Sequence, residues 1–156
     1  NKKTQARFDE FVKNSANKKT DLFFHGSRNE NWLPILQSGL LLRPTGAVIT
    51  GKMFGYGTYY ADKAQKSWGY TSAHGSYWAR GNASEAYMAL FNVHLGNPYH
   101  IRRHESWHCD LNERKLKSKG DYDSVFAEGG YDLRNSEYIV YTEDQSTIQY
   151  LIQMRG

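Results

Sequence analysis

Three short blocks of this sequence each place a polar side chain beside small residues at the end of an expected β-strand. They are His25-Gly26-Ser27 and the segments 53–62 and 135–141. The apolar run 22–24 leads directly into the first block, and Glu137 in the third block stands just ahead of another apolar run. Glycine has no side chain and lets a ligand approach the backbone closely. The blocks therefore predict a ligand site where several strands end.

Taken in order, the blocks resemble the catalytic domain of the poly(ADP-ribose) polymerase family, which carries a His-Tyr-Glu triad. The second block contains Phe54-Gly55-Tyr56-Gly57-Thr58-Tyr59 and matches the family pattern Phe-Gly-x-Gly-x-Tyr. The resemblance makes His25, Tyr59 and Glu137 the expected catalytic residues. It covers roughly residues 22–152, so we expect 1–156 to form a single catalytic domain. It implies an enzyme that consumes NAD and transfers ADP-ribose to an acceptor.

The resemblance also implies which residues bind NAD. His25 is expected at a hydroxyl of the adenine ribose, and the backbone of Gly26 at the nicotinamide carboxamide. Ser67 is expected to donate its hydroxyl to that carboxamide, while Tyr59 and Tyr70 sandwich the nicotinamide ring. The remaining expected NAD contacts are Ser27, Arg43, Tyr60 and Lys66.

Three of these contacts have particular settings. Lys66 is expected to neutralise the phosphates of NAD. Tyr60 follows Tyr59 in a strand and therefore stands on the opposite face, because successive side chains alternate. Arg43 lies in the loop 41–50, which corresponds to the family's donor loop over bound NAD. Some members have an arginine directly after Ser-Gly-Leu, where this chain has Leu41 and reaches Arg43 two places later.

Glu137 has the chemistry that cleavage of the nicotinamide–ribose bond requires. The nicotinamide group of NAD is already cationic and leaves without an acid, through a transition state that resembles an oxocarbenium ion. A carboxylate that holds a ribose hydroxyl orients the sugar and places negative charge beside it. A glutamate at the start of a strand is ordinarily a solvated edge residue. The functional interpretation therefore depends on the other two blocks.

Several functions stay open within this interpretation. A glutamate as third triad residue permits extension of an ADP-ribose chain, whereas mono-ADP-ribosylation of a protein or of nucleic acid is the alternative. A non-catalytic module that binds NAD or ADP-ribose is a third possibility, but it would be expected to have lost part of the triad. A P-loop or a Rossmann fingerprint is excluded, because the third glycine and the Gly-Lys-Thr sequence are both missing. No serine stands in a Gly-x-Ser-x-Gly elbow.

The hydrophobic pattern predicts an α+β fold. Helices are expected over 4–13, from Asn31 to Gly39, and after Asp62 to Trp68. The segment 71–85 is expected to be a loop. With the resemblance, this predicts an ADP-ribosyltransferase-like fold in which two packed antiparallel or mixed sheets form an NAD cleft, with a few flanking helices. The expected strands, joined by hairpins, are 22–24, 58–61, 86–95, 98–102, 124–127, 137–142 and 148–153.

Charge bears on the partners. The chain has 20 Lys and Arg against 16 Asp and Glu, a net charge of +4, and its pI is near 9.1. This favours polyanions, either nucleic acid or a growing ADP-ribose chain, and a protein acceptor is implied by the resemblance. The basic segment 114–119 either contacts such a partner or forms a solvated hairpin. The 24 residues before His25 are too few for the family's autoinhibitory helical domain, and we expect no DNA-binding module in this chain.

The single cysteine and the apolar runs bear on location. Cys109 excludes an internal disulfide and fits a reducing compartment, so we expect an intracellular protein, nuclear or cytoplasmic. His104 and His108 lie close to Cys109 but lack a second ligand pair at finger-type spacing, so we expect no metal. No apolar run approaches the roughly 20 residues that cross a bilayer, so we expect no membrane association.

Overall fold

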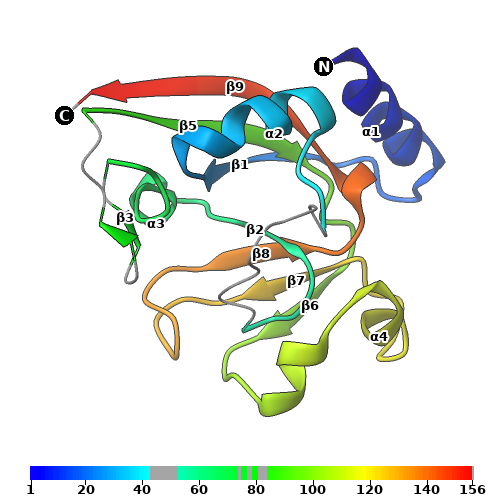
Figure 1. Ribbon diagram of the computed structural model, residues 1–156. Helices are drawn as coiled ribbons and strands as arrows, with labels where there is room; N and C mark the ends of the chain where they lie inside the picture. Colours follow the sequence, from blue (N-terminus) through cyan, green and yellow to red (C-terminus); the bar gives the residue numbers. More distant parts are fainter. Residues whose placement is uncertain (43–52, 74, 77–78, 81–83, 156) are drawn as a thin grey trace.

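Two β-sheets pack against each other in the computed structural model of the chain, which describes residues 1–42, 53–73, 75–76, 79–80 and 84–155 (Figure 1). The three-stranded sheet consists, in spatial order, of β1 (Asp21–Gly26), β5 (Glu85–Val93) and β9 (Ser146–Arg155). The four-stranded sheet consists, in spatial order, of β2 (Thr58–Tyr60), β8 (Glu137–Val140), β7 (Ser124–Ala127) and β6 (Pro98–Ile101). The predicted α+β class with two packed sheets is confirmed.

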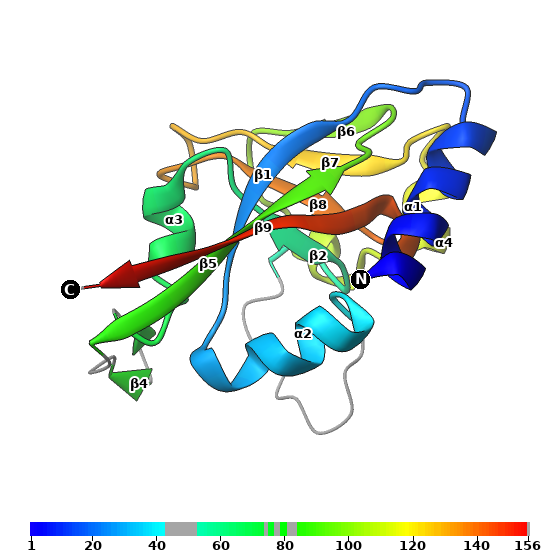
Figure 2. The ribbon, with the colours of Figure 1, turned by 90° about the horizontal axis from the view of Figure 1, so that it is seen from above.

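Short helices flank the two sheets. Seen from above, α3 lies at one end of the sheets and α1 at the other (Figure 2). The helices are α1 (Lys2–Asn14), α2 (Trp32–Ser38), α3 (Ala64–Trp68) and α4 (Glu113–Lys117), with 3₁₀ turns η1 (Asn29–Asn31), η2 (Ser106–Asp110) and η3 (Glu143–Gln145). No described helix is both long and apolar enough to cross a bilayer.

The space between the sheets is filled by one hydrophobic cluster. Phe23 and Phe91 come from the three-stranded sheet, Tyr60 and Val140 from the four-stranded sheet, and Trp32 from α2. All five are buried. Burial of each such side chain stabilises the fold by about 1.5–3 kcal/mol, so this cluster holds the sheets together.

A second hydrophobic cluster covers the other face of the four-stranded sheet. It contains Val125 and Ile139 from the strands, Phe54 from the turn before β2, and Leu111 and Leu116 from the region of α4. Because side chains alternate along a strand, neighbouring residues of β8 enter different clusters. The four-stranded sheet is thus buried on both faces.

A bridge between β1 and β2 joins the two sheets at one point. The Phe24 amide donates to the Ala61 carbonyl at 2.8 Å, and the Ala61 amide donates back to the Phe24 carbonyl at 3.0 Å. This pairing brings the end of β1 against the end of β2. The first and second sequence blocks therefore meet in space.

Three local expectations were wrong. A short hairpin, β3 (Gly75–Ser76) and β4 (Ala79–Arg80), lies within the segment expected to be a loop. β6 and β7 pair in parallel, so the basic segment between them is a crossover that contains η2 and α4 rather than a hairpin. A hairpin can join only antiparallel strands. The helix expected to be capped by Asp62 begins after Lys63, which makes no side-chain cap.

Candidate active site

His25 is oriented by the backbone of the neighbouring strand. Its Nδ1 lies 2.9 Å from the Tyr59 carbonyl oxygen. A carbonyl only accepts, so Nδ1 carries the hydrogen and Nε2 is the acceptor of the neutral ring. Burial lowers the pKa of His25, and the bond to the Tyr59 carbonyl opposes this shift. The expected contact of His25 with a ribose hydroxyl therefore stays a prediction, with Nε2 as the ring atom left for it.

Two hydrogen bonds, one accepted and one donated by its hydroxyl, fix the position of Tyr59. The hydroxyl accepts from the Phe54 amide at 3.0 Å and donates to the Gly55 carbonyl at 2.9 Å. Burial raises the pKa of Tyr59 well above its usual value, and the Glu137 carboxylate adds to this shift. The hydroxyl therefore stays neutral and closes the turn that precedes β2, which leaves the ring as a rigid wall.

Glu137 begins β8 on the same face as Tyr59. Tyr59 stands opposite Ile139 in the antiparallel register, and Glu137 precedes Ile139 by two residues. The Glu137 residue is only 7% exposed. Its carboxylate lies 3.1 Å from the Lys66 ammonium, which also donates to the Asn135 carbonyl at 3.2 Å. Glu137 is thus a buried carboxylate with a largely buried cationic partner and not a solvated edge residue.

Lys66 forms an ion pair with the Glu137 carboxylate in this structure. We predicted that it would neutralise the phosphates of NAD; the structure pairs its ammonium with Glu137, and the Lys66 side chain is 16% exposed. Because α3 carries Lys66 and β8 carries Glu137, the ion pair joins this helix to the four-stranded sheet. No local pattern indicates this pairing, since the two residues lie far apart in the chain.

The end of β1 and α3 make the closest contact in the site. A Cβ at Gly26 would lie 1.9 Å from the backbone oxygen of Ser67, so only glycine fits there. Ser67 itself is 3% exposed. The contact places the Gly26 backbone beside Ser67, the two groups expected to bind one carboxamide.

Tyr70 follows α3 and faces the same carboxylate. The residue is 54% exposed, so one side of the ring is open to a ligand. Desolvation raises the pKa of the Tyr70 hydroxyl, and the Glu137 charge raises it further. The Glu137 charge thus acts on the hydroxyls of both Tyr59 and Tyr70.

The two glycines of the second block lie in the turn into β2. A Cβ at Gly55 would lie 2.1 Å from the Leu111 carbonyl oxygen, and Gly55 has a φ of +80°. A Cβ at Gly57 would lie 2.4 Å from Ile139. Protein neighbours therefore require glycine at both positions.

The remaining predicted NAD contacts are placed as follows. Tyr60 is 2% exposed in the core between the sheets, and its hydroxyl lies 2.5 Å from the Ser146 hydroxyl. Tyr60 thus lies on the face of β2 that packs between the sheets, and its contact with NAD stays a prediction. Ser27 accepts from the Asn31 side chain at 2.9 Å. Arg43 lies outside the described residues.

Sequence reasoning missed the groups that hold the turn before β2. The Tyr141 hydroxyl lies 2.5 Å from the Phe54 carbonyl, and His104 Nε2 lies 2.7 Å from the Met53 carbonyl. The Tyr56 amide donates to the Leu111 carbonyl at 2.8 Å. These contacts come from β8 and the crossover, and no local pattern in the sequence marks them. In the sequence, His104 was considered only as a possible zinc ligand. Among the described residues, no group of three or more His, Cys, Asp or Glu could hold a metal ion.

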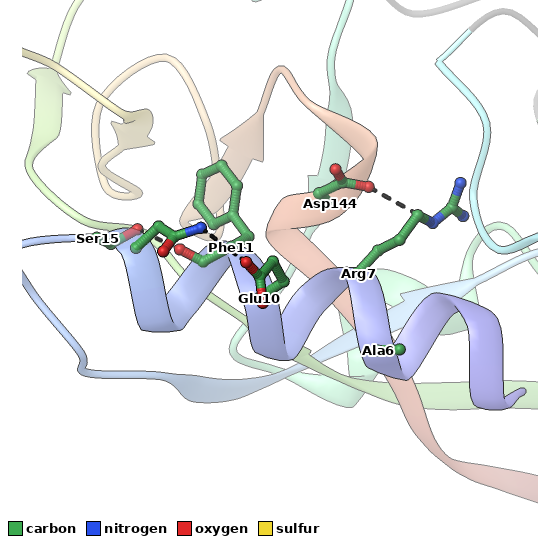
Figure 3. Close-up of a pocket in the computed structure, with 7 residues that line it drawn as sticks. Ala6, Arg7, Glu10, Phe11, Ser15 and Asp144 are labelled. Atoms are coloured by element: carbon green, nitrogen blue, oxygen red, sulfur yellow. Dashed lines mark hydrogen bonds and ion pairs between the residues drawn. The ribbon is translucent and has the colours of Figure 1, made fainter.

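A groove of about 520 Å³ lies elsewhere, along α1 (Figure 3). It runs between this helix and η3, where Arg7 and Asp144 form an ion pair at 3.6 Å. None of the predicted site residues lines it. Two of its charged groups, Arg7 and Asp144, already pair with each other. The lining residues are Ala6, Arg7, Glu10, Phe11, Asn14, Ser15 and Asp144.

Comparison with known proteins gives the family. A family model described as the poly(ADP-ribose) polymerase catalytic domain matches residues 2–156. The chain belongs to this family. Its members are NAD-dependent ADP-ribosyltransferases, so the enzyme class predicted from the three blocks is confirmed.

Individual relatives agree. The chain is 36% identical to a poly(ADP-ribose) polymerase-like protein, 100L, of Invertebrate iridescent virus 6, over 97% of this chain and 80% of that protein. It is 31% identical to poly(ADP-ribose) polymerase 2 of Arabidopsis thaliana over 94% of this chain, and 29% identical to poly(ADP-ribose) polymerase 2 of Homo sapiens over 86%. It spans 26% of the length of each of those two larger proteins.

Proposed function

We propose that this chain transfers ADP-ribose from NAD to an acceptor and extends the product into a chain. One observation carries the proposal: Glu137 is a buried carboxylate, held by Lys66 and set on the same face as Tyr59. A preorganised negative charge of this kind stabilises positive charge that develops on a sugar. The acceptor is proposed to be a protein or the end of a growing ADP-ribose chain.

The described residues fit NAD. His25 Nε2 is available to accept from a ribose hydroxyl, because Nδ1 is committed to the Tyr59 carbonyl. Gly26 and Ser67 offer a backbone and a hydroxyl beside each other for a carboxamide. Tyr59 and the half-exposed Tyr70 offer ring faces for a flat aromatic group, where stacking contributes on the order of 1 kcal/mol.

The residues divide the work between binding and charge stabilisation. In the reaction, the bond from the ribose carbon to nicotinamide breaks and its electrons stay with nicotinamide. An acceptor hydroxyl oxygen bonds to that carbon and passes its proton to the Glu137 carboxylate. Glu137 binds a ribose hydroxyl and stabilises the positive charge that develops on the sugar. Lys66 holds the Glu137 carboxylate in place through their ion pair. Tyr59 and Tyr70 orient the leaving ring.

Two alternatives define the test. A mono-ADP-ribosyltransferase would give products of one unit, and a module that only binds NAD would release no nicotinamide. The experiment incubates the chain with NAD labelled in its adenylate part, measures free nicotinamide, and sizes the labelled product on a gel. A ladder of long products supports the proposal, a single short band supports mono-ADP-ribosylation, and absence of nicotinamide with intact binding supports the module.

We propose an intracellular location for the domain. Cys109 is free and exposed, which is the state that a reducing compartment maintains. Cells that express the chain are treated with a thiol reagent while intact and are then lysed under conditions that block thiol exchange. The labelled fraction of Cys109 tests this location. Full labelling supports it, and a mixed disulfide at Cys109 contradicts it.

A further inference from the structure

Most of the net charge of the chain is concentrated in one segment. Residues 98–119 contain six Lys and Arg and three Asp and Glu, which gives +3 of the total of +4. This segment is the crossover from β6 through η2 to α4. In Figure 1 it runs along the outside of the four-stranded sheet, on the side away from the three-stranded sheet.

Contacts join this segment and the loop between β7 and β8 into one surface. Arg103 pairs with Asp132 of that loop at 3.2 Å, and the His104 amide donates to the same carboxylate at 2.5 Å. The rings of Trp107 and His108 are 4.3 Å apart, and the Lys119 ammonium lies 4.4 Å from the centre of the Trp107 ring. These contacts join the loop to the start of the crossover, and η2 to the end of α4.

Aromatic rings alternate with cations along this surface. Arg102 and Arg103 lie 5.9 Å and 5.3 Å from the centre of the Tyr131 ring, and Tyr131 is 44% exposed. The two arginine side chains are 61% and 72% exposed. We call the set of Arg102, Arg103, Trp107, Lys119 and Tyr131, together with the exposed Arg114 of α4, the basic–aromatic strip.

Carboxylates neutralise part of the charge and leave hydrogen-bond donors free to act. Arg102 uses Nε on Glu128 at 2.9 Å, and Arg103 uses Nη1 on Asp132. A guanidinium carries five N–H donors, so each arginine keeps further donors for a phosphate. Lys117, in contrast, lies 2.7 Å from Asp123 and is left out of the strip.

We propose that the basic–aromatic strip binds single-stranded nucleic acid. Strands of this kind are held by cations that follow the phosphates and by aromatic rings on which unpaired bases stack, and the strip offers both. An acidic peptide would use the cations but not the exposed face of Tyr131. A duplex would hide its bases, and α4 has only five residues, too few to read a groove. The proposal does not depend on the transferase activity.

The test is fluorescence anisotropy with a labelled oligothymidylate longer than the roughly 4–16 nucleotides that one binding domain covers. Two strip variants are Arg114→Gln with Lys119→Gln, and Arg102→Gln with Arg103→Gln. A third, Tyr131→Ala, keeps the charge. The control is Lys2→Gln with Lys3→Gln on α1, which removes the same charge from exposed positions elsewhere.

We expect salt-dependent binding by the unchanged chain. Each strip double variant should weaken binding about tenfold and lower the slope against salt by about 1.4, since each phosphate contact contributes about 0.7. Tyr131→Ala should weaken binding with the slope unchanged, and the α1 control should bind like the unchanged chain. Thermal melting confirms that the variants are folded.

Other outcomes overturn the proposal. Absence of binding at low salt, strip variants that bind as well as the unchanged chain, or an equal loss in the α1 control would each contradict it. Polyglutamate that competes as well as unlabelled oligothymidylate would show a general anion surface instead. The readout is binding alone, so a failure of the transferase proposal, seen as absent nicotinamide release, is measured separately.

Discussion

The Lys66 ammonium and the Glu137 carboxylate lie 3.1 Å apart, and both side chains are largely shielded from water. Each charge is tolerated because the other is present. Removal of one partner of a buried ion pair typically costs about 3–5 kcal/mol, because the remaining charge is left unpaired. The pair therefore couples the stability of the site to its chemistry.

Lys66→Gln and Glu137→Gln should therefore be strongly non-additive. Each single variant should lower the free energy of unfolding by about 3 kcal/mol, and the double variant should lose much less than the sum. Denaturant unfolding of the four proteins measures the coupling. Lys63→Gln, an exposed lysine just before α3, is the control and should change stability little. Additive losses would show that the two charges do not stabilise each other.

Tyr70→Ala should weaken binding of a nicotinamide analogue about fivefold at little cost in stability. The ring is half exposed, so its loss removes a stacking face and not a core contact. A benzamide titrated by calorimetry, or followed through the rise in melting temperature, measures the effect.

Tyr60→Phe is the matched control for Tyr70→Ala. It removes only the buried hydroxyl bonded to Ser146 and should cost about 1 kcal/mol of stability while benzamide binding stays intact. The opposite pattern, with binding lost in Tyr60→Phe and kept in Tyr70→Ala, would place the ring-binding site elsewhere.

Gly26→Ala should disrupt the site through backbone geometry alone. The added methyl group would meet the Ser67 backbone oxygen at 1.9 Å, so α3 must move away from β1. Overpacking of this kind costs about 1–3 kcal/mol, and we expect benzamide affinity to fall with it. Gly130→Ala is the control, because a Cβ there would meet nothing within 4 Å although its φ is +91°. Equal benzamide affinity in both variants would argue against a pocket at Gly26.

Stability should fall as the pH drops below about 6.5, the unfolded-state value for histidine. The pKa of His25 is below that value in the folded chain. As the pH falls, the unfolded state therefore binds the proton first, and protonation stabilises it relative to the folded state. The stabilisation is present above this pH and is lost as the pH decreases toward the folded pKa. Burial also lowers the pKa of His108, so it contributes to the same slope.

His25→Gln should remove part of this pH dependence and leave the share of His108. Denaturant unfolding between about pH 7.5 and about pH 5.5 measures the slope in both proteins. An unchanged slope in the variant would show that His25 takes up its proton as readily in the folded chain as in the unfolded one.

Local features of the sequence predicted more than pairings between distant segments. The apolar run before His25 and the alternation of Tyr59 and Tyr60 depend on neighbouring residues, and the structure has both features. The parallel pairing of β6 with β7 depends on contacts between segments far apart in the chain. The spacing of apolar residues predicts strands but not which strands pair. The partner of Lys66 and the close packing of Gly55 against Leu111 were missed for the same reason.

Nicotinamide release by the Glu137→Gln variant tests the central claim most directly. The substitution keeps the shape of the side chain and removes its charge, so the variant should still bind benzamide while nicotinamide release from NAD falls by about two to three orders of magnitude. The unchanged chain and Lys63→Gln serve as references in the same assay. A folded Glu137→Gln variant that binds benzamide and releases nicotinamide at the unchanged rate would contradict the assignment of Glu137 as the catalytic carboxylate.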